Sequence, residues 1–166
     1  MPQQLDNLVF DRTALDVVQL QAVTARLVSG TATAEDRATW LAGMKGAYNY
    51  TDLNRVGAAV EYLTALLYSL GYNVGTAATT GWTETDIPSS GQMEQYLNNV
   101  KTLRACLPYV APNAPADMGR LTWQEANAIE EILATLEDVL EAMQAAFLTR
   151  QANTLFMIAG GVFNNA

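Results

Sequence analysis

The chain has 166 residues, half of them hydrophobic, and its 17 acidic and 9 basic side chains give a net charge of −8. This length fits one domain with a buried core, and this hydrophobic content excludes a wholly disordered chain. The negative charge would repel phosphate backbones and anionic lipids, so we expect neither nucleic acid nor a membrane surface as a partner. We expect a single helical domain over residues 1–166.

Five helical segments are predicted, and the first three lie in the N-terminal half. The first follows Thr13, where a hydroxyl and the Asp16 carboxylate can cap the helix, and it ends near Gly30. The second is short and follows Thr33. The third begins at Thr51, and its apolar residues recur at spacings of three and four up to Gly71, which is typical of one buried helix face.

The fourth predicted helix opens at Ser89, which has capping-box spacing with Gln92, and it ends at Pro108. The fifth opens at Thr122 and extends to Thr149 or beyond. Helices with such apolar stripes pack together in bundles, and antiparallel packing is the default for short connections. The sequence therefore predicts a mainly α fold, an antiparallel bundle of about five helices. Its predicted core includes Leu63, Leu67, Val100, Ile132 and Leu136.

The last residues, 153–166, are apolar and β-prone around Gly160-Gly161, and we expect a small β element there. An apolar strand seeks a partner, which could be the tail itself, the region of Val74, or a neighbouring chain. The sequence leaves these options even and makes a homo-oligomer one outcome. The candidate contact residues of the tail are Leu155, Phe156, Ile158 and Phe163.

No catalytic residue, cofactor or metal is expected. Histidine is absent, which removes the commonest general base and metal ligand and excludes a Ser-His-Asp or Cys-His site within the chain. No phosphate-binding loop or dinucleotide fingerprint occurs. The single cysteine, Cys106, cannot form an intrachain disulfide and is expected to be a buried, inert thiol.

Carboxylates are the remaining candidates for chemistry, because a pair of them can hydrolyse glycosidic bonds. We expect most of the acidic residues to be helix caps or solvated faces instead, with Glu130, Glu131, Glu137, Asp138 and Glu141 on the polar side of the fifth helix. A carboxylate-based cell-wall hydrolase is therefore a minor alternative. Its candidate residues are Glu61, Asp86, Glu94, Glu125 and Glu137.

Several aromatic residues fall in predicted turns and loops. Aromatic rings there can stack on sugars or anchor a protein, but more often they close the ends of a helical bundle. The Tyr48-Asn49-Tyr50 turn directly before a capped helix is the best candidate for an exposed contact, and Trp82 is a second. A carbohydrate- or receptor-binding module using these rings is the main alternative function.

One segment, WLAGMKGAYNYTDLNRV at residues 40–56, resembles a helical module of prophage-encoded structural proteins of Gram-positive gut bacteria. The similarity extends to Asp11-Arg12-Thr13, to Asp86-Ile87-Pro88 with Gln92-Met93 and Tyr96-Leu97, and to Leu121-Thr122 with Glu125-Ala126-Asn127 and Ile129-Glu130. The chain departs from that module at its end, where TLFMIAGGVFNNA replaces Tyr-Ser-Gly-Glu-like repeats.

The resemblance implies a virion component associated with a tail or fibre, and it carries over no catalytic residues. It also implies that the partners are other phage structural proteins or further copies of the chain. The expected location is the bacterial cytoplasm during assembly and then the virion, since the N-terminus has no signal-peptide pattern.

Overall fold

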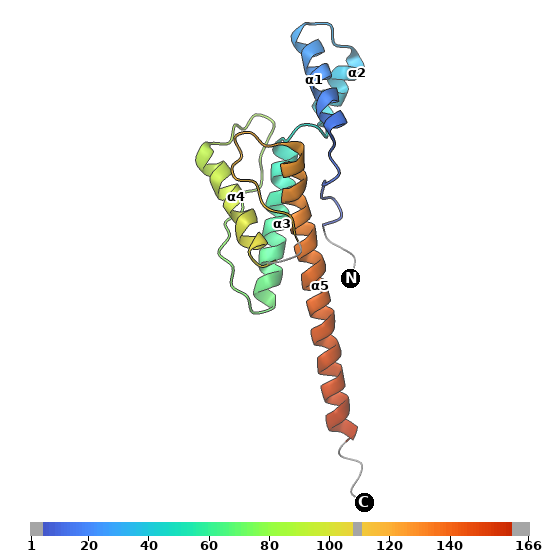
Figure 1. The fold of residues 1–166 in the computed structure, drawn as a ribbon, viewed down its shortest axis with the longest axis vertical. Helices are drawn as coiled ribbons and strands as arrows, with labels where there is room; N and C mark the ends of the chain where they lie inside the picture. Colours follow the sequence, from blue (N-terminus) through green and yellow to red (C-terminus); the bar gives the residue numbers. More distant parts are fainter. Residues whose placement is uncertain (1–4, 108–110, 161–166) are drawn as a thin grey trace, which may run out of the picture.

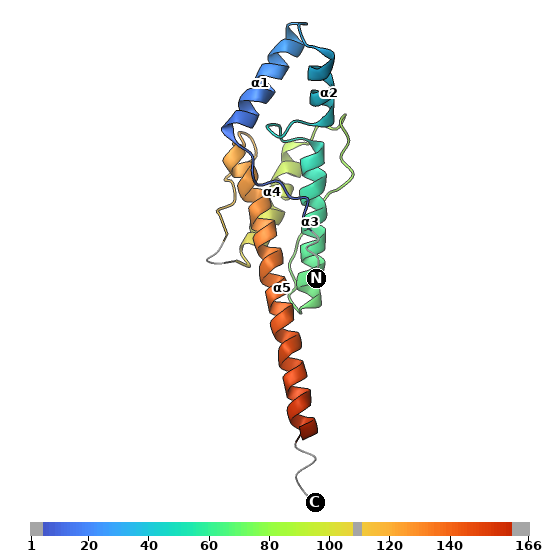
Figure 2. The same cartoon turned by 90° about the vertical axis from the view of Figure 1, so that its right-hand side faces the viewer.

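The fold is mainly α, with five helices and no strand in the residues that the computed structural model describes, 5–107 and 111–160; side chains are described as far as Arg150. Figures 1 and 2 show an elongated molecule with a small helical hairpin at one end and a long projecting helix at the other. The helices are α1 (Ala14–Val28), α2 (Ala34–Ala42), α3 (Tyr50–Ser69), α4 (Ser90–Arg104) and α5 (Trp123–Gly160).

Side-chain caps set the starts of the helices, as the sequence predicts. Thr13, Thr33 and Ser89 each accept a hydrogen bond from the backbone three residues later, and the side chain found there returns one. Thr122 and Glu125 make the same reciprocal pair at the start of α5. The cap of α3 is Asn49, two residues before the predicted Thr51.

The core lies where α3, α4 and α5 meet. All five residues predicted for it are buried, with no more than 3% of their surface exposed, which confirms the assignment of the apolar stripes to one core. The stripes of α3 and α5 contribute most of the fully buried side chains, and Val100, Leu103 and Leu107 extend the cluster from α4 and the residues after it.

The three core helices run in the same direction, so the predicted antiparallel packing is wrong. Arg55 on α3 bonds Glu130 on α5, and seven residues further along each helix Tyr62 lies against Glu137. Residue numbers therefore rise in the same direction along the two helices. Figure 1 shows the same direction for α4. The connections explain the error: residues 70–89 and 105–122 are long enough to return the chain to the start of the bundle, whereas antiparallel packing is the default only for short loops.

Three asparagines hold extended segments against the helices. Asn54 on α3 bonds both the N–H and the carbonyl of Trp82, with both distances 2.8 Å. Asn99 on α4 does the same for Ala77, and Asn127 on α5 for Arg12. Each amide satisfies a donor and an acceptor that would otherwise be left unpaired in a packed segment. These clamps compensate for the absence of a β-sheet partner.

Gly57 lets residues 79–80, in the connection between α3 and α4, pack directly on α3. A Cβ atom at this position would lie 2.6 Å from the carbonyl oxygen of Thr79, which is closer than side chains tolerate. We expect Gly57→Ala to lower the urea midpoint of unfolding, because the backbone of residues 79–80 would have to move. Gly91→Ala in α4 is the matched control, since its Cβ would meet nothing within 4 Å. A midpoint unchanged in Gly57→Ala would contradict the close packing.

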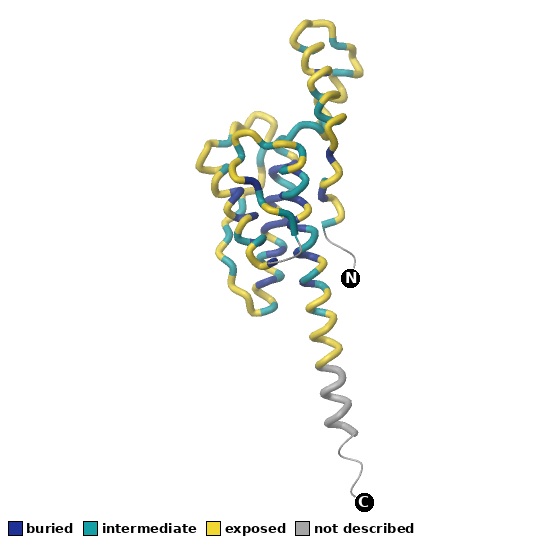
Figure 3. The backbone as a smooth tube through the Cα atoms, viewed as in Figure 1, coloured by how far each residue is buried: buried dark blue, intermediate teal, exposed yellow. Residues whose placement is uncertain are grey.

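Two parts of the molecule extend beyond the core. The hairpin of α1 and α2 is joined by the Arg26–Asp36 ion pair, with Nε 2.9 Å from the carboxylate, and Val23 is the single buried side chain of these two helices. At the other end, α5 continues past the bundle with exposed residues (Figure 3). Residues 153–160 belong to α5, so the predicted β element is wrong for them, and residues 161–166 lie outside the described residues.

Cys106 also differs from its prediction. Its side chain is exposed, because α4 ends at Arg104 and the turn that follows directs Leu107 into the core instead. Partial desolvation raises the pKa of the thiol, which favours the unreactive protonated form.

Candidate functional site

A cluster of four charged side chains, three of them buried, lies where the N-terminal segment crosses α3 and α5. Nη2 of Arg12 lies 2.7 Å from both the Asp52 and the Glu130 carboxylates. Arg55 bonds the same two groups, with its Nε 2.8 Å from Glu130. Arg12 is 3% exposed and Glu130 fully buried. Two cations and two anions therefore neutralise each other inside the protein.

The cluster also fixes the backbone of the N-terminal segment. The N–H of Val9 donates to Glu130 over 2.6 Å, and the Arg12 guanidinium donates to the Val9 carbonyl. Asp52 also takes part in the cap of α3, because its other oxygen accepts a hydrogen bond from the N–H of Asn49. The start of α3, the first turns of α5 and the segment before α1 are thus tied to one set of charges.

This arrangement favours a structural role over catalysis. The oxygens of Asp52 and Glu130 accept from two guanidinium groups and from backbone N–H groups, and neither side chain is open to solvent. A general acid or base must reach a substrate proton, and a glycosidase pair needs a groove between its two carboxyl groups. The paired charges connect the N-terminal segment to α3 and α5.

Tyr48 is half-buried, and its polar contacts are with groups of the interior. Its hydroxyl lies 2.5 Å from that of Tyr96, and its ring lies under the Arg12 guanidinium at 5.4 Å. Burial raises the pKa of the Tyr48 phenol well above its ordinary value, and the pKa of Tyr96 rises for the same reason. The turn before α3 therefore joins the charge cluster to α4.

The raised pKa values of Tyr48 and Tyr96 predict that the folded protein loses stability in alkali. Their pKa values are raised on folding, so the folded state holds their protons more tightly and is favoured below pH 10, the ordinary pKa of tyrosine. As the pH rises above 10 the unfolded chain loses those protons first, and stability falls. We expect the melting temperature to drop more steeply from pH 9.5 to 11 in the wild type than in Tyr48→Phe. Parallel curves for the two proteins would contradict this account.

The other predicted contact residues do not gather around one cleft. Asn49 is the cap of α3, and Trp82 packs on the core with its backbone held by Asn54. Tyr50 is half-buried and faces a different hollow from Tyr48. In the tail, Leu155, Phe156 and Ile158 belong to the last turns of α5, and Phe163 lies outside the described residues.

The candidate carboxylates are also dispersed. Glu61, Asp86 and Glu94 are exposed on separate elements, and Glu125 caps α5. The prediction of a solvated acidic face is wrong for Glu130 and for Glu137, which is 2% exposed and lies against Tyr62. In the part of the chain that the structure describes, no group of three or more acidic or thiol side chains is placed to hold a metal ion.

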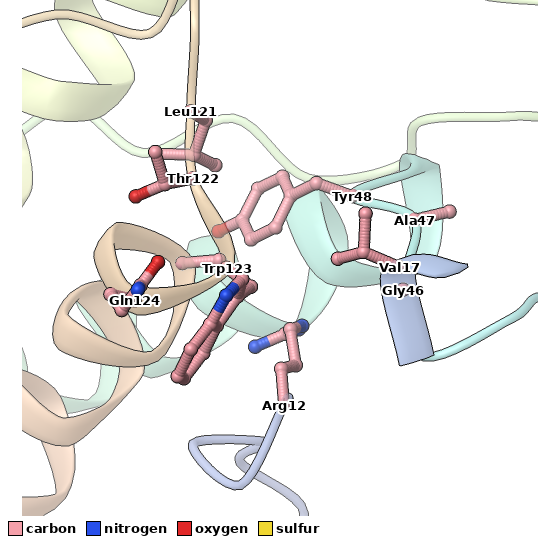
Figure 4. Close-up of a pocket in the computed structure, with 10 residues that line it drawn as sticks. Arg12, Val17, Gly46, Ala47, Tyr48, Leu121, Thr122, Trp123 and Gln124 are labelled. Carbon is pink, nitrogen blue, oxygen red and sulfur yellow. The ribbon is translucent and has the colours of Figure 1, made fainter. Parts of the chain in front are cut away.

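Two hollows lie near the base of the hairpin. One, of about 380 Å³, is shown in Figure 4 and lies between Arg12, Val17, Tyr48 and the start of α5 at Trp123. The other, with a volume of about 460 Å³, is lined mainly by apolar side chains. It lies between the hairpin and the start of α3, and its walls include Leu20, Trp40, Leu41, Met44 and Tyr50.

Sequence reasoning missed the charge cluster, although a signal for it was present. Asp52 and Arg55 stand three residues apart at the start of α3, the spacing of an ion pair along one helix face. The pairing of Arg12 and Arg55 with Glu130, across 75 or more positions, could not be read from one sequence.

No protein-family model, curated protein or solved structure matches the chain. Among the helices of the described residues, none has both the length and the apolar character that crossing a membrane requires.

Proposed function

We propose that this chain is a non-enzymatic structural module of a phage or prophage particle, associated with its tail or fibre, and that it works through protein–protein assembly. The observation that carries the proposal is the distribution of exposed apolar side chains over an elongated molecule. They occur on the hairpin at one end, where Trp40 is 48% and Leu41 68% exposed. They occur again on the projecting part of α5, where Phe147 is 60% exposed.

Exposed large apolar side chains at opposite ends suit a component that is joined on both sides, because such surfaces mark protein contacts. The charge cluster supports the same role. It holds the N-terminal segment, α3 and α5 in one arrangement without offering a reactive group, as expected of a rigid spacer. The resemblance of residues 40–56 to prophage structural modules supplies the particle setting.

The test is the composition of isolated particles. Particles released by induction of a lysogen that carries this gene are banded in a density gradient, and each fraction is digested for mass spectrometry. We expect peptides of this chain to follow the major capsid and tail proteins through the gradient. Peptides confined to the unbanded protein at the top of the gradient would contradict a structural role. A host enzyme of similar abundance, followed through the same gradient, is the control for proteins that adhere to the particles non-specifically.

Carbohydrate binding is the second candidate, and the apolar hollow favours it. Trp40 and Tyr50 flank this hollow together with the polar side chains of Asn49 and Glu84, a combination that suits a sugar ring. Calorimetric titration with soluble cell-wall glycans separates the two functions. Binding by the wild type that is lost in Trp40→Ala would favour a glycan-binding module. A carboxylate hydrolase has less support, since Asp52 and Glu130, which bind the same two arginines, are both neutralised by them.

A further inference from the structure

The free half of α5, residues 141–160, extends beyond the ends of α3 and α4 (Figure 1). Among the side chains described as far as Arg150, Leu140 is the last buried one of α5, and every position from Met143 to Arg150 except Gln144 is exposed. Met143, Phe147 and Leu148 are 39%, 60% and 57% exposed. Isolated helices of this length are marginal in water, and their stability usually comes from packing of an apolar face. Met143, Phe147 and Leu148 therefore leave apolar surface of this segment open to solvent.

The exposed apolar side chains continue the face that fills the core. An α-helix turns by about 100° per residue, so Phe147 stands at the same angle as the buried Ile129, five turns earlier. Met143 follows the buried Leu136 by seven residues and lies within about 20° of it. In the bundle this face is covered by α3 and α4, which end at Ser69 and Arg104. Beyond those ends α5 continues alone (Figure 2), and most of its described residues there are exposed (Figure 3).

The charge distribution indicates what can cover it. After Leu140 the sequence holds only two charged residues, Glu141 and Arg150, so the net charge of −8 resides entirely in residues 1–140. A strongly basic or acidic partner would find no complementary charge on the free half of α5, whereas a second neutral, apolar helix fits it. The same segment of another copy is such a helix, and it is present at equal concentration.

We propose that the free half of α5 pairs with the same segment of a second copy of this chain, with the two helices antiparallel. The orientation follows from the shared face. If the helices were parallel and in register, each bundle would lie on the side of α5 that faces the other copy, and the two bundles would compete for the same space. Antiparallel helices place the bundles at opposite ends, where their negative charges are also furthest apart. This pairing deepens the proposed assembly function and rests on it.

The size of the interface sets the conditions of the test. Residues 143–160 form about 27 Å of helix, which offers less than the roughly 800 Å² per partner of a standard interface. We therefore expect association at micromolar concentrations of the full-length chain. Light scattering after size exclusion should give the 18.0 kDa of one chain when dilute and approach twice that value as the concentration rises.

Two matched variants assign the contact. Phe147→Glu should remain a monomer at every concentration, because it places a charge on the paired face outside the bundle. Ile87→Glu makes the same change in a loop at a residue 93% exposed and should dimerise like the wild type. Circular dichroism melting confirms that both variants are folded. A monomeric wild type at 200 μM, or a dimer that survives Phe147→Glu, would overturn the pairing.

The orientation is measured by spin labels in the background Cys106→Ser, with Glu141→Cys as the single labelling site. Antiparallel helices that overlap over residues 143–160 place the two labels about 30 Å apart, whereas parallel helices place them about 10–15 Å apart. The longer distance is expected, and the shorter one would overturn the antiparallel arrangement. If the chain bands with particles but stays monomeric in isolation, the pairing fails while the proposed function stands.

Discussion

Replacing Glu130 with Gln is expected to destabilise the fold by about 3–5 kcal/mol, the usual cost of breaking a buried ion pair from one side. The substitution keeps the shape of the side chain but leaves Arg12 and Arg55 with one carboxylate, that of Asp52, inside the protein. It also weakens the acceptor for the Val9 N–H. Urea unfolding followed by circular dichroism measures the change as a lower midpoint at constant slope.

Glu131→Gln is the control, since it removes the same charge from the neighbouring position of α5 where the side chain is exposed. Surface substitutions of this kind change stability by about 0.5 kcal/mol or less. A Glu130→Gln variant that unfolds at the same urea concentration as Glu131→Gln would show that the cluster contributes no stability. Limited proteolysis adds a local measurement, because cleavage before Thr13 should become faster in Glu130→Gln alone.

Leu63→Ala is expected to cost about 2–5 kcal/mol, because it removes part of a fully buried side chain at the centre of the bundle and leaves a cavity. Leu41→Ala makes the same chemical change in α2, where the side chain is 68% exposed, and should leave the free energy of unfolding nearly unchanged. Thermal melting of both variants is the measurement. Equal melting temperatures would mean that Leu63 does not lie in the core.

The sequence predicted those features of the fold that depend on local chemistry. The capping residues Thr13 and Ser89 were found because each has its capping partner three residues later. The core residues were found because helical periodicity is also local. Asn49 was missed as the cap of α3 because Tyr48-Asn49-Tyr50 has the pattern of a turn, which places the predicted start of the helix at Thr51.

Features that depend on distant contacts were predicted poorly. Residues 70–89 could either join neighbouring helix ends directly or run back along the length of α3, and this sets the relative direction of the helices. Asn54 and Asn99 hold the segment along the helices, which gives the second arrangement. Glu130 was expected on a solvated face because its neutralising arginines are remote in sequence. The β-prone composition of residues 153–160 did not override the continuation of α5, since helix formation propagates from the packed part of the helix.

The central claim is that this chain acts by assembly through the apolar surfaces at its two ends. Hydrogen–deuterium exchange on the free chain and on the chain within purified particles tests it most directly. We predict that exchange slows in the particle at residues 40–44 of the hairpin and 141–150 of α5, while the slow exchange around Leu63 and Leu136 stays the same. Equal exchange of both end segments in the two states would contradict the claim.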